Sequence, residues 1–415
     1  MTGTVGKQWA ILVAGAKDWD NYGLQANICH AYQIVHKNGI PDDQVVVMMY
    51  DDIAYNDENP YRGNIINEPN GPNVYPGVLK DYTGDDVTPE NFLAALRGDE
   101  SAVTKTGPKK VIKSGKDDTV FVFLSDHGAP GMFCFPSSSL YAIDFIEELQ
   151  NMAKNNQFAE MVIFMECCYS GSMLENLPEN ISIYGVTACP PDTVAYFCFF
   201  DDIRQTYLAA EMSAVWMSYT EESALDEITF HDEFQNLHDH MQMSVPCEYG
   251  DKDVSKLAVS TFLQNTPPST QECKKVQKPT DLVSFYEAPF KILEHRIQRE
   301  DNPVKKEALK KKYDNLIKMK SNIERTVEEV RQLCLAGGYG EYAAARTTSL
   351  SLTQLQDFKA VAELFRTTCF NWHESKFEYV LSQLHVFANL CASGRGVHGI
   401  LEAIQHVRRS STVFE

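Results

Sequence analysis

The sequence predicts an α/β fold, in which helices cover both faces of a parallel β-sheet, followed by a small all-helical domain. Over residues 1–262, short apolar runs of strand type alternate with helical patterns, which is typical of a parallel sheet buried on both faces. Prolines, threonines and lysines then gather at residues 264–280 and predict a linker. Beyond the linker, apolar residues recur only at helical spacing. The linker therefore separates two domains of different class.

Five apolar runs rich in β-branched and aromatic residues predict the strands of the sheet. Each run is apolar without interruption, as expected for strands with no solvent-exposed face. The five runs span residues 9–13, 45–49, 120–124, 161–165 and 181–186. Helical patterns lie between them, for example at 24–37 and 140–153. The loop at 51–88 is longer than a connection requires, and we expect it to line the ligand crevice at the carboxyl ends of the strands.

The helical domain is predicted over residues 303–415, with residues 263–302 as the linker. Asn302 before Pro303 makes a good helix start, because asparagine caps free N–H groups and proline suits the first turn. Apolar residues then follow nearly helical spacing as far as residue 333. Further helical patterns are found at 350–365, 376–391 and 397–407.

Composition excludes several functional classes. The chain has 415 residues, of which 44% are hydrophobic and 11% aromatic, which is enough for a full core and excludes a disordered protein. No run reaches the roughly 18 uncharged apolar residues of a membrane helix, so we expect no membrane span. The net charge of −20 argues against nucleic acid as a partner. The start of the chain lacks the pattern of a secretory signal peptide.

The charge is distributed unevenly along the chain. Residues 281–415 hold 19 basic and 17 acidic side chains, whereas residues 1–280 hold 18 basic and 40 acidic ones. The net charges of the two parts are therefore +2 and −22. We expect two domains of such different charge to attract each other.

Eleven cysteines are present, an odd number. They form no Cys-x-x-Cys pair and no metal-ligand spacing with histidine, so we expect no zinc or other metal, and no cofactor. A chain of this length needs no disulfide framework, and the cysteines do not imply one.

Two predicted strands end in reactive polar clusters that contain glycine. They run into Ser-Asp-His-Gly at 125–128 and Glu-Cys-Cys-Tyr-Ser-Gly at 166–171. The carboxyl ends of parallel strands are where such folds build their sites. A thiolate and an imidazole there can serve as nucleophile and proton carrier, and the N–H groups of Gly128 and Gly171 can hold an oxyanion. Buried cysteines are also common core residues and such histidines are often structural, so the residues alone leave both interpretations open.

Several long strings resemble the legumain family of asparaginyl endopeptidases. They include SDHGAPGMFCFP at 125–136, ECCYSGSMLENLPENISIYGVTA at 166–188, and much of 30–56 and 59–99. The string FRTTCFNWHESKFEYVLSQLHVFANLC at 365–391 is similar to the family's helical prodomain. The resemblance covers nearly the whole chain. It implies a caspase-like α/β/α sandwich with cysteine endopeptidase activity, followed by an inhibitory prodomain.

The resemblance also implies the catalytic residues. The family's Glu-x-Cys-x-Ser-Gly pattern places the nucleophile on Cys168, and side-chain alternation turns Cys167 to the other face. His127 takes the general acid/base role, and Asn21 matches the asparagine that orients its ring. A turn or a helix cap is the alternative role of Asn21. The N–H groups of Gly128 and Cys168 are the expected oxyanion donors.

The specificity pocket departs from the family, which holds the P1 asparagine with an arginine, a glutamate and an aspartate. Here Glu166 matches the glutamate, but Gly23 stands at the arginine position and Ala210 at that of the aspartate. Losing the cation removes a bidentate donor, and Lys17 would replace it only with different geometry. We therefore expect an altered or relaxed P1 preference, for Asn, Asp or another residue. The substrate-binding positions implied are Glu166, Asp126, Ser170, Gly23, Ala210 and Glu211, which lies next to the aspartate position.

Asp126 matches an acidic neighbour of the histidine that the family links to peptide-ligase behaviour. An aspartate before a histidine can equally have a structural hydrogen-bonding role, which is the alternative.

The resemblance implies a zymogen whose prodomain covers the active site and leaves on acidification, in a lysosome-like compartment or after secretion. The charge distribution agrees, because acid neutralises the carboxylates that attract the helical domain. Most such charges are ordinary solvated surface, which is the alternative. Five of the eleven histidines lie in the linker or the helical domain and would gain charge there: His295, His373, His385, His398 and His406.

Autocatalytic cleavage within the activation peptide, residues 263–302, would make release irreversible. Asn265 and Asn302 are the candidate cleavage positions, although Asn302 has a helix cap as its alternative role and precedes a proline. Cys369 and Cys391 each match one member of the two disulfides of the family's prodomain. Their usual partners are absent, so the usual bridging cannot form and a Cys369–Cys391 bond stays open.

The leading hypothesis is thus a legumain-like endopeptidase acting on proteins and peptides, with its own prodomain and cystatin-type inhibitors as partners. The first alternative is a catalytically weak or inhibitory binding protein of the same fold, because Gly23 and Ala210 alter the pocket. The second is a membrane-anchored transamidase, which the lack of a membrane helix disfavours. Arg97-Gly98-Asp99 is an integrin-type tripeptide that is common by chance, and Asn180 begins a glycosylation sequon that matters only after secretion.

Overall fold

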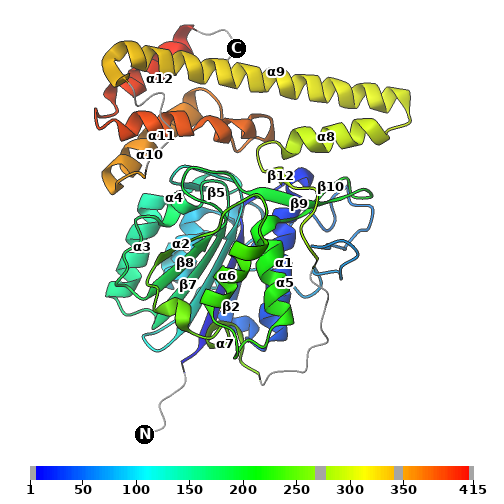
Figure 1. Ribbon diagram of the computed structural model, residues 1–415, viewed down its shortest axis with the longest axis vertical. Coiled ribbons are helices and arrows are strands. Elements are labelled where there is room, and N and C mark those ends of the chain that lie inside the picture. Colours follow the sequence, from blue (N-terminus) through cyan, green and yellow to red (C-terminus); the bar gives the residue numbers. More distant parts are fainter. Residues whose placement is uncertain (1–5, 267–276, 341–348, 411–415) are drawn as a thin grey trace.

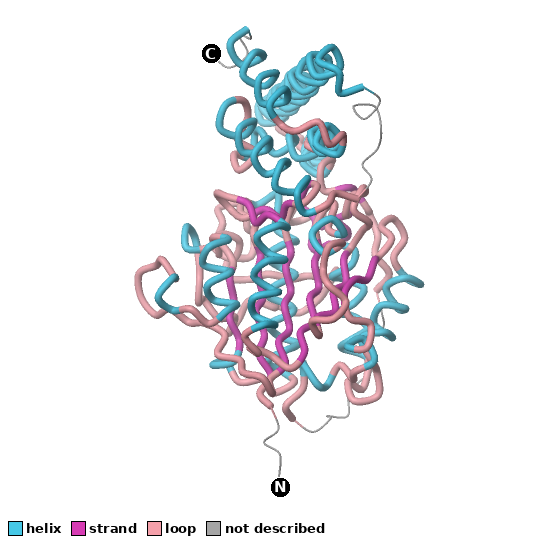
Figure 2. The backbone as a smooth tube through the Cα atoms, turned by 90° about the vertical axis from the view of Figure 1, so that its left-hand side faces the viewer, coloured by secondary structure: helices cyan, strands magenta, loops and turns pink. Residues whose placement is uncertain are grey.

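The computed structural model describes residues 6–266, 277–340 and 349–410. Figure 1 shows two stacked parts, an α/β domain and a helical layer above it. In the side view of Figure 2 the strands lie in the lower part, and the upper part consists of helices and loops. The predicted α/β/α architecture with a carboxyl-terminal helical domain is confirmed.

Six strands form the central sheet, in the order β11-β8-β7-β3-β1-β2. All neighbours run parallel except β11, which is antiparallel to β8. The five predicted runs are all strands here, and most of their residues are buried, as their unbroken apolar character requires. The bounds are β1 Gln8–Ala14, β2 Val45–Met48, β3 Thr119–Ser125, β7 Glu160–Glu166, β8 Ile183–Thr187 and β11 Cys247–Gly250.

Helices cover the sheet on both sides, with α2 and α3 on the left of Figure 1 and α1 and α5 on the right. Trp216 of α5 makes edge contacts with Phe121 and Phe123 of β3 and Phe164 of β7, which centres the core on these two strands. The bounds are α1 Tyr22–Lys37, α2 Pro89–Arg97, α3 Ala142–Lys154, α4 Gly171–Leu174, α5 Glu211–Glu222, α6 Phe230–His240 and α7 Ser260–Leu263.

Two small antiparallel sheets lie near the carboxyl end of the central sheet, beneath the helical domain (Figure 1). One has the order β4-β5-β6 and the other the order β10-β9-β12. Their bounds are β4 Gly128–Ala129, β5 Met132–Cys134, β6 Ser139–Tyr141, β9 Tyr196–Asp201, β10 Thr206–Ala210 and β12 Val283–Ser284.

Strand β12 and helix α8 (Ala288–Arg299) lie inside the segment predicted to be a linker. The Pro, Thr and Lys residues before helix α8 led to the prediction of a linker, and the helix itself was not predicted. Its Phe290, Ile292 and Leu293 are buried. Helix α8 packs on the long helix α9 (Pro303–Cys334), for instance through the ring contact of Phe290 with Tyr313. Asn302 caps α9 as predicted, because its side-chain oxygen accepts from the N–H groups of Val304 and Lys305.

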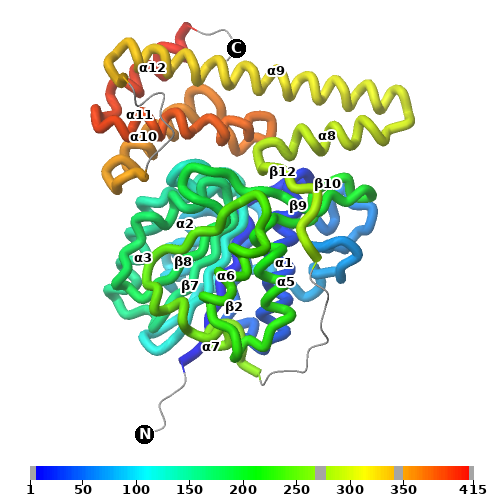
Figure 3. The backbone as a smooth tube through the Cα atoms, in the orientation of Figure 1, coloured from blue at the N-terminus to red at the C-terminus, as the bar shows by residue number. Residues whose placement is uncertain are grey.

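The remaining helices pack beneath and beside α9, as the orange and red segments of Figure 3 show. The predicted helix at 376–391 is divided into a 3₁₀-helix and α11. The bounds are α10 Leu352–Thr368, the 3₁₀-helix Ser375–Gln383, α11 His385–Ala392 and α12 His398–Ser410.

Within the described ranges, no helix is both long and apolar enough to cross a membrane. Cys369 and Cys391 are free thiols, as are the other cysteines that the structure describes. Over the same residues, no group of three or more His, Cys, Asp or Glu side chains could hold a metal ion.

Candidate active site

Strands β3 and β7 bring His127 and Cys168 to the same edge of the sheet. The two strands are parallel neighbours in which Ser125 pairs with Glu166. His127 and Cys168 each follow this pair by two residues, so equivalent positions of adjacent strands carry the imidazole and the thiol. Both side chains are buried.

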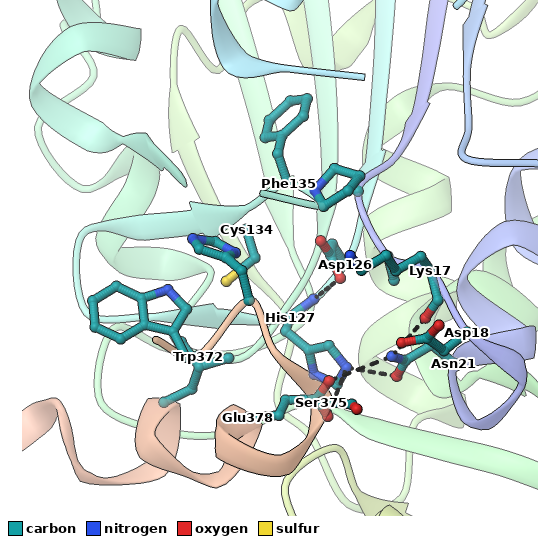
Figure 4. A pocket seen from close by; sticks show the side chains of 15 residues that line it. Lys17, Asp18, Asn21, Asp126, His127, Cys134, Phe135, Trp372, Ser375 and Glu378 are labelled. Atoms are coloured by element: carbon teal, nitrogen blue, oxygen red, sulfur yellow. Dashed lines mark hydrogen bonds and ion pairs between the residues drawn. The ribbon is translucent and has the colours of Figure 1, made fainter. Parts of the chain in front are cut away.

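Asn21 holds the ring of His127. It ends a 3₁₀ turn, Trp19–Asn21, that leads into α1, and its Oδ1 lies 2.7 Å from His127 Nε2. The Asn21 amide nitrogen donates to the Lys17 carbonyl at 3.0 Å, which leaves the oxygen to accept from the ring (Figure 4). The Asn21 side chain makes no capping hydrogen bond to α1, so the alternative cap role is not what its geometry shows.

The proton distribution on His127 follows from this contact. Because Asn21 Oδ1 can only accept, Nε2 carries the ring proton and Nδ1 has a free lone pair. His127 Nδ1 is buried and has no hydrogen-bond partner. This nitrogen is therefore the one that can take a proton from a thiol.

Cys168 is fully buried, and its Sγ accepts a hydrogen bond from the Ala195 N–H at 3.3 Å. Burial, together with the nearby Cys189, raises the pKa of the Cys168 thiol well above its ordinary value. The next residue, Tyr169, has φ 56, in the left-handed region that strains a non-glycine residue. Burial in this structure therefore favours the protonated form of the thiol.

Glycine is required at position 128 because the backbone passes very close to the cysteine turn. A Cβ there would lie 2.6 Å from the Cys168 carbonyl oxygen and 2.9 Å from Cys167 Sγ. Gly171 differs from our expectation, because its N–H already donates to the Cys189 carbonyl at 3.0 Å. It is therefore not a free oxyanion donor.

Glu166 is completely buried beside the site. Its Oε2 accepts from the Ser213 N–H at 2.8 Å and hydroxyl at 3.0 Å, while Oε1 is buried without a partner. Burial raises the pKa of Glu166 to about 8. The carboxyl group is therefore neutral at acid pH and can donate from Oε1. The adjacent Ser170 has a structural contact, since its hydroxyl accepts from the Cys189 N–H.

The expected specificity positions do not form an open polar pocket. Gly23 of α1 packs directly on β10, where a Cβ would lie 2.9 Å from the Ala209 nitrogen and 3.1 Å from the Tyr207 oxygen. Ala210 is buried, with its N–H 3.4 Å from Asn27 Oδ1. The arginine of the family would therefore require β10 to move.

Glu211 does not replace the missing aspartate. Its carboxylate accepts from the backbone N–H groups of Gln242, Met243 and Ser244, and so fixes that loop. Asp126 is buried, and its Oδ1 accepts from the His127 N–H at 2.6 Å. Burial raises the pKa of Asp126 well above its ordinary value. This hydrogen bond is the kind that the structural alternative for Asp126 predicts.

Sequence reasoning missed the residues that close the site from outside the catalytic domain. Glu378, on the 3₁₀-helix of the helical domain, has Oε1 3.3 Å from His127 Nε2 and Oε2 3.4 Å from the Asn21 amide nitrogen (Figure 4). Tyr286, from the segment after β12, donates to the Gly128 carbonyl at 2.5 Å. No local pattern marks either residue, because their roles depend on how the helical domain docks.

The fold and the paired thiol and imidazole define a cysteine endopeptidase. The sequence model of the Peptidase C13 family matches residues 8–266, and the chain belongs to that family. It is 40% identical to "Legumain" of Rattus norvegicus over 405 residues, covering 97% of this chain and 92% of that protein. It is 33% identical to "Legumain" of Canavalia ensiformis, covering 94% and 86% of the two chains.

Among solved structures, caspase-1 from Spodoptera frugiperda aligns with a TM-score of 0.37 and 11% identity. That alignment covers 59% of this chain and 87% of the caspase.

Proposed function

We propose that this chain is the zymogen of a legumain-like cysteine endopeptidase that is activated at acid pH. The observation that carries the proposal is the Asn21–His127 pair, which leaves Nδ1 free at the strand position beside Cys168. A peptidase of this kind needs an imidazole with one nitrogen fixed and the other basic.

The reaction proceeds by acyl transfer to sulfur. His127 Nδ1 takes the thiol proton of Cys168, and the thiolate attacks the scissile carbonyl carbon. The N–H groups of Gly128 and Cys168 hold the oxyanion. The imidazolium returns its proton to the leaving amine as the C–N bond breaks, and water then hydrolyses the thioester by the same route. Asn21 keeps the ring oriented throughout.

The P1 site proposed here has fewer charged groups than the P1 site of the family. The neutral Glu166 carboxyl group can donate from its free Oε1 to the carbonyl oxygen of a P1 amide or acid. With Gly23 and Ala210 in place of charged groups, the ion-paired recognition of the family is lost. Cleavage after Asn, with Asp and other residues also accepted, is the specificity we propose.

The proposed domains are a catalytic part at 1–262, an activation peptide at 263–302 and a prodomain at 303–415 that acts as a lid. Cations from the activation peptide and the lid pair with carboxylates of the catalytic part. Arg296 lies 2.9 Å from Asp20, and Lys359 lies 2.7 Å from Asp144. Acid protonates such carboxylates and weakens these contacts, as a lysosome-like or secreted acidic setting would require.

Autocatalytic cleavage would then make the opening permanent. Asn265 is the better of the two candidate positions, because the Asn302 side chain caps α9 and precedes Pro303. Protein and peptide substrates and cystatin-type inhibitors are the partners of the opened enzyme under this proposal.

The test uses purified full-length chain at neutral pH and at about pH 4–5, where carboxylates become protonated. A diverse peptide library is digested, and the cleavage sites are identified by mass spectrometry, with Cys168→Ala in parallel. We expect acid-dependent cleavage that Cys168→Ala abolishes. The absence of any Cys168-dependent cleavage would contradict the proposal and favour a binding protein of the same fold.

A further inference from the structure

The segment after residue 280 lies along the edge of β9 as an added strand. Val283 and Ser284 pair antiparallel with Phe197 and Tyr196, and the Phe285 N–H donates to the Ala195 carbonyl at 3.0 Å. Ala195 also donates its own N–H to Cys168 Sγ. The edge of β9 therefore carries a peptide in extended form directly to the thiol. Such pairing uses main-chain groups that any peptide possesses.

Phe285 fills an aromatic site next to the catalytic imidazole. Its ring stacks on Phe197 with a centroid distance of 4.2 Å and lies edge-on to His127 at 5.5 Å. Phe197 stacks in turn on Tyr207 at 5.9 Å. Phe285 is fully buried, yet the other three rings belong to the catalytic domain. When the segment leaves, Phe197 and Tyr207 would remain as an unfilled apolar site beside His127.

Tyr286 explains why the segment can lie in this position without being cut. Its hydroxyl donates to the Gly128 carbonyl, and its side chain contacts the Cys168 thiol. The Tyr286 side chain thus faces the nucleophile. The segment occupies the groove with a phenol group, which cannot be hydrolysed, against the thiol.

We propose that substrates of this enzyme dock antiparallel on the edge of β9 with an aromatic side chain in the site now held by Phe285. The proposal rests on the proposed peptidase function and adds a substrate class to it. Phe285 hydrogen-bonds to Ala195, and Ala195 also contacts the Cys168 thiol. The aromatic residue of a substrate bound in this way therefore lies within about two residues of the scissile bond. Stacked aromatic pairs add to affinity beyond the area they bury.

The experiment profiles acid-treated full-length chain on a peptide library, comparing wild type with Phe197→Leu. We expect Phe, Tyr or Trp to be enriched at one fixed position, and Phe197→Leu to reduce that enrichment about fivefold. The matched control is Phe230→Leu on α6, whose ring packs on Phe164 and Phe262 in the core of the catalytic domain. We expect the control variant to keep the enrichment of aromatic residues at that position.

A binding measurement separates this proposal from the peptidase function. Acid-treated Cys168→Ala chain is titrated with a fluorescent library peptide that contains phenylalanine, and with the same peptide carrying alanine there. Tighter binding of the phenylalanine peptide supports the aromatic site even if wild type cleaves nothing, which would overturn only the peptidase function. Cleavage without aromatic enrichment overturns the aromatic site and leaves the peptidase function intact. Equal binding of both peptides, or no binding of either, also overturns the aromatic site.

Discussion

Glu378 and Asn21 meet at the same nitrogen of His127. The carboxylate of Glu378 lies 3.3 Å from Nε2, and the carboxamide oxygen of Asn21 lies 2.7 Å from it. A residue of the helical domain thus binds to the pair that prepares the imidazole for catalysis. The helical domain therefore contacts this pair directly through a charged side chain.

Replacing Glu378 by alanine should weaken the closed state. The change removes a charged hydrogen-bonding group from His127 and Asn21, which is worth about tenfold in the equilibrium between closed and open chain. Peptide cleavage at neutral pH should rise by a similar factor. Glu374→Ala is the control, because Glu374 lies on the same segment but is exposed and pairs with Lys376. Equal activity of the two variants would contradict this role of Glu378.

His373 should contribute to opening in acid. Burial, the nearby Arg366 and, to a smaller extent, Lys17 lower the pKa of His373 to about 4, while Glu363 and the Phe135 backbone have smaller opposing effects. The released lid has an ordinary histidine pKa of roughly 6.5, so the open state binds the proton first and closure weakens as pH falls from about 6.5 to 4. His373→Gln should therefore shift activation to lower pH.

The measurement for His373 is the pH at which activity appears during stepwise acidification of the full-length chain. His406→Gln is a suitable control, because His406 is an exposed residue of the same domain. Identical activation profiles of wild type and His373→Gln would show that His373 does not sense pH.

Gly23→Ala should destabilise the catalytic domain. The added methyl group would lie 2.9 Å from the Ala209 backbone nitrogen, so α1 and β10 must separate. Overpacking of this kind costs about 2 kcal/mol in the free energy of unfolding. Urea denaturation of Gly23→Ala and of Lys37→Ala, an exposed site on the same helix, provides the comparison. An equal urea midpoint for both variants would mean that β10 shifts to accommodate the added methyl group at little cost in stability.

Glu166→Gln should flatten the pH dependence of stability. The pKa of Glu166 is about 8 in the folded chain against 4.5 for the ordinary group. Between these values the folded state holds a proton that the unfolded state releases, so the free energy of unfolding falls as pH rises, by up to roughly 5 kcal/mol. The variant lacks this group and should lose less stability between pH 5 and 8. Thermal melts at both pH values, with exposed Glu147→Gln as the control, measure the difference.

Tyr286→Ala should expose the nucleophile. Removing the phenol ring uncovers Cys168 and frees the Gly128 carbonyl. Alkylation of Cys168 by iodoacetamide at neutral pH, followed by site-resolved mass spectrometry, should become severalfold faster. Tyr313→Ala on α9 is the control, since Tyr313 bonds to Glu294 within the outer helices. An unchanged rate at Cys168 would show that other groups shield the thiol.

The sequence was most informative where local pattern decides structure. The unbroken apolar runs predicted β1, β3 and β7, and the polar clusters that follow them predicted where His127 and Cys168 would meet. Helix α8 was missed because the prolines and lysines before it masked its amphipathic pattern. The contacts of Glu378, Phe285 and Tyr286 could not be predicted, because they depend on docking between segments more than 80 residues apart. The packing of Gly23 on β10 likewise depends on tertiary structure and could not be predicted from local sequence.

The free thiols at Cys369 and Cys391 have a consequence for inhibition after cleavage. Within the residues that the structure describes, no covalent bond other than the chain itself ties the helical domain to the catalytic one. After a single cut near Asn265, the helical domain and the catalytic domain would be separate molecules, and their association would become bimolecular. The fraction of inhibited enzyme would then depend on protein concentration, and dilution alone would favour the active form.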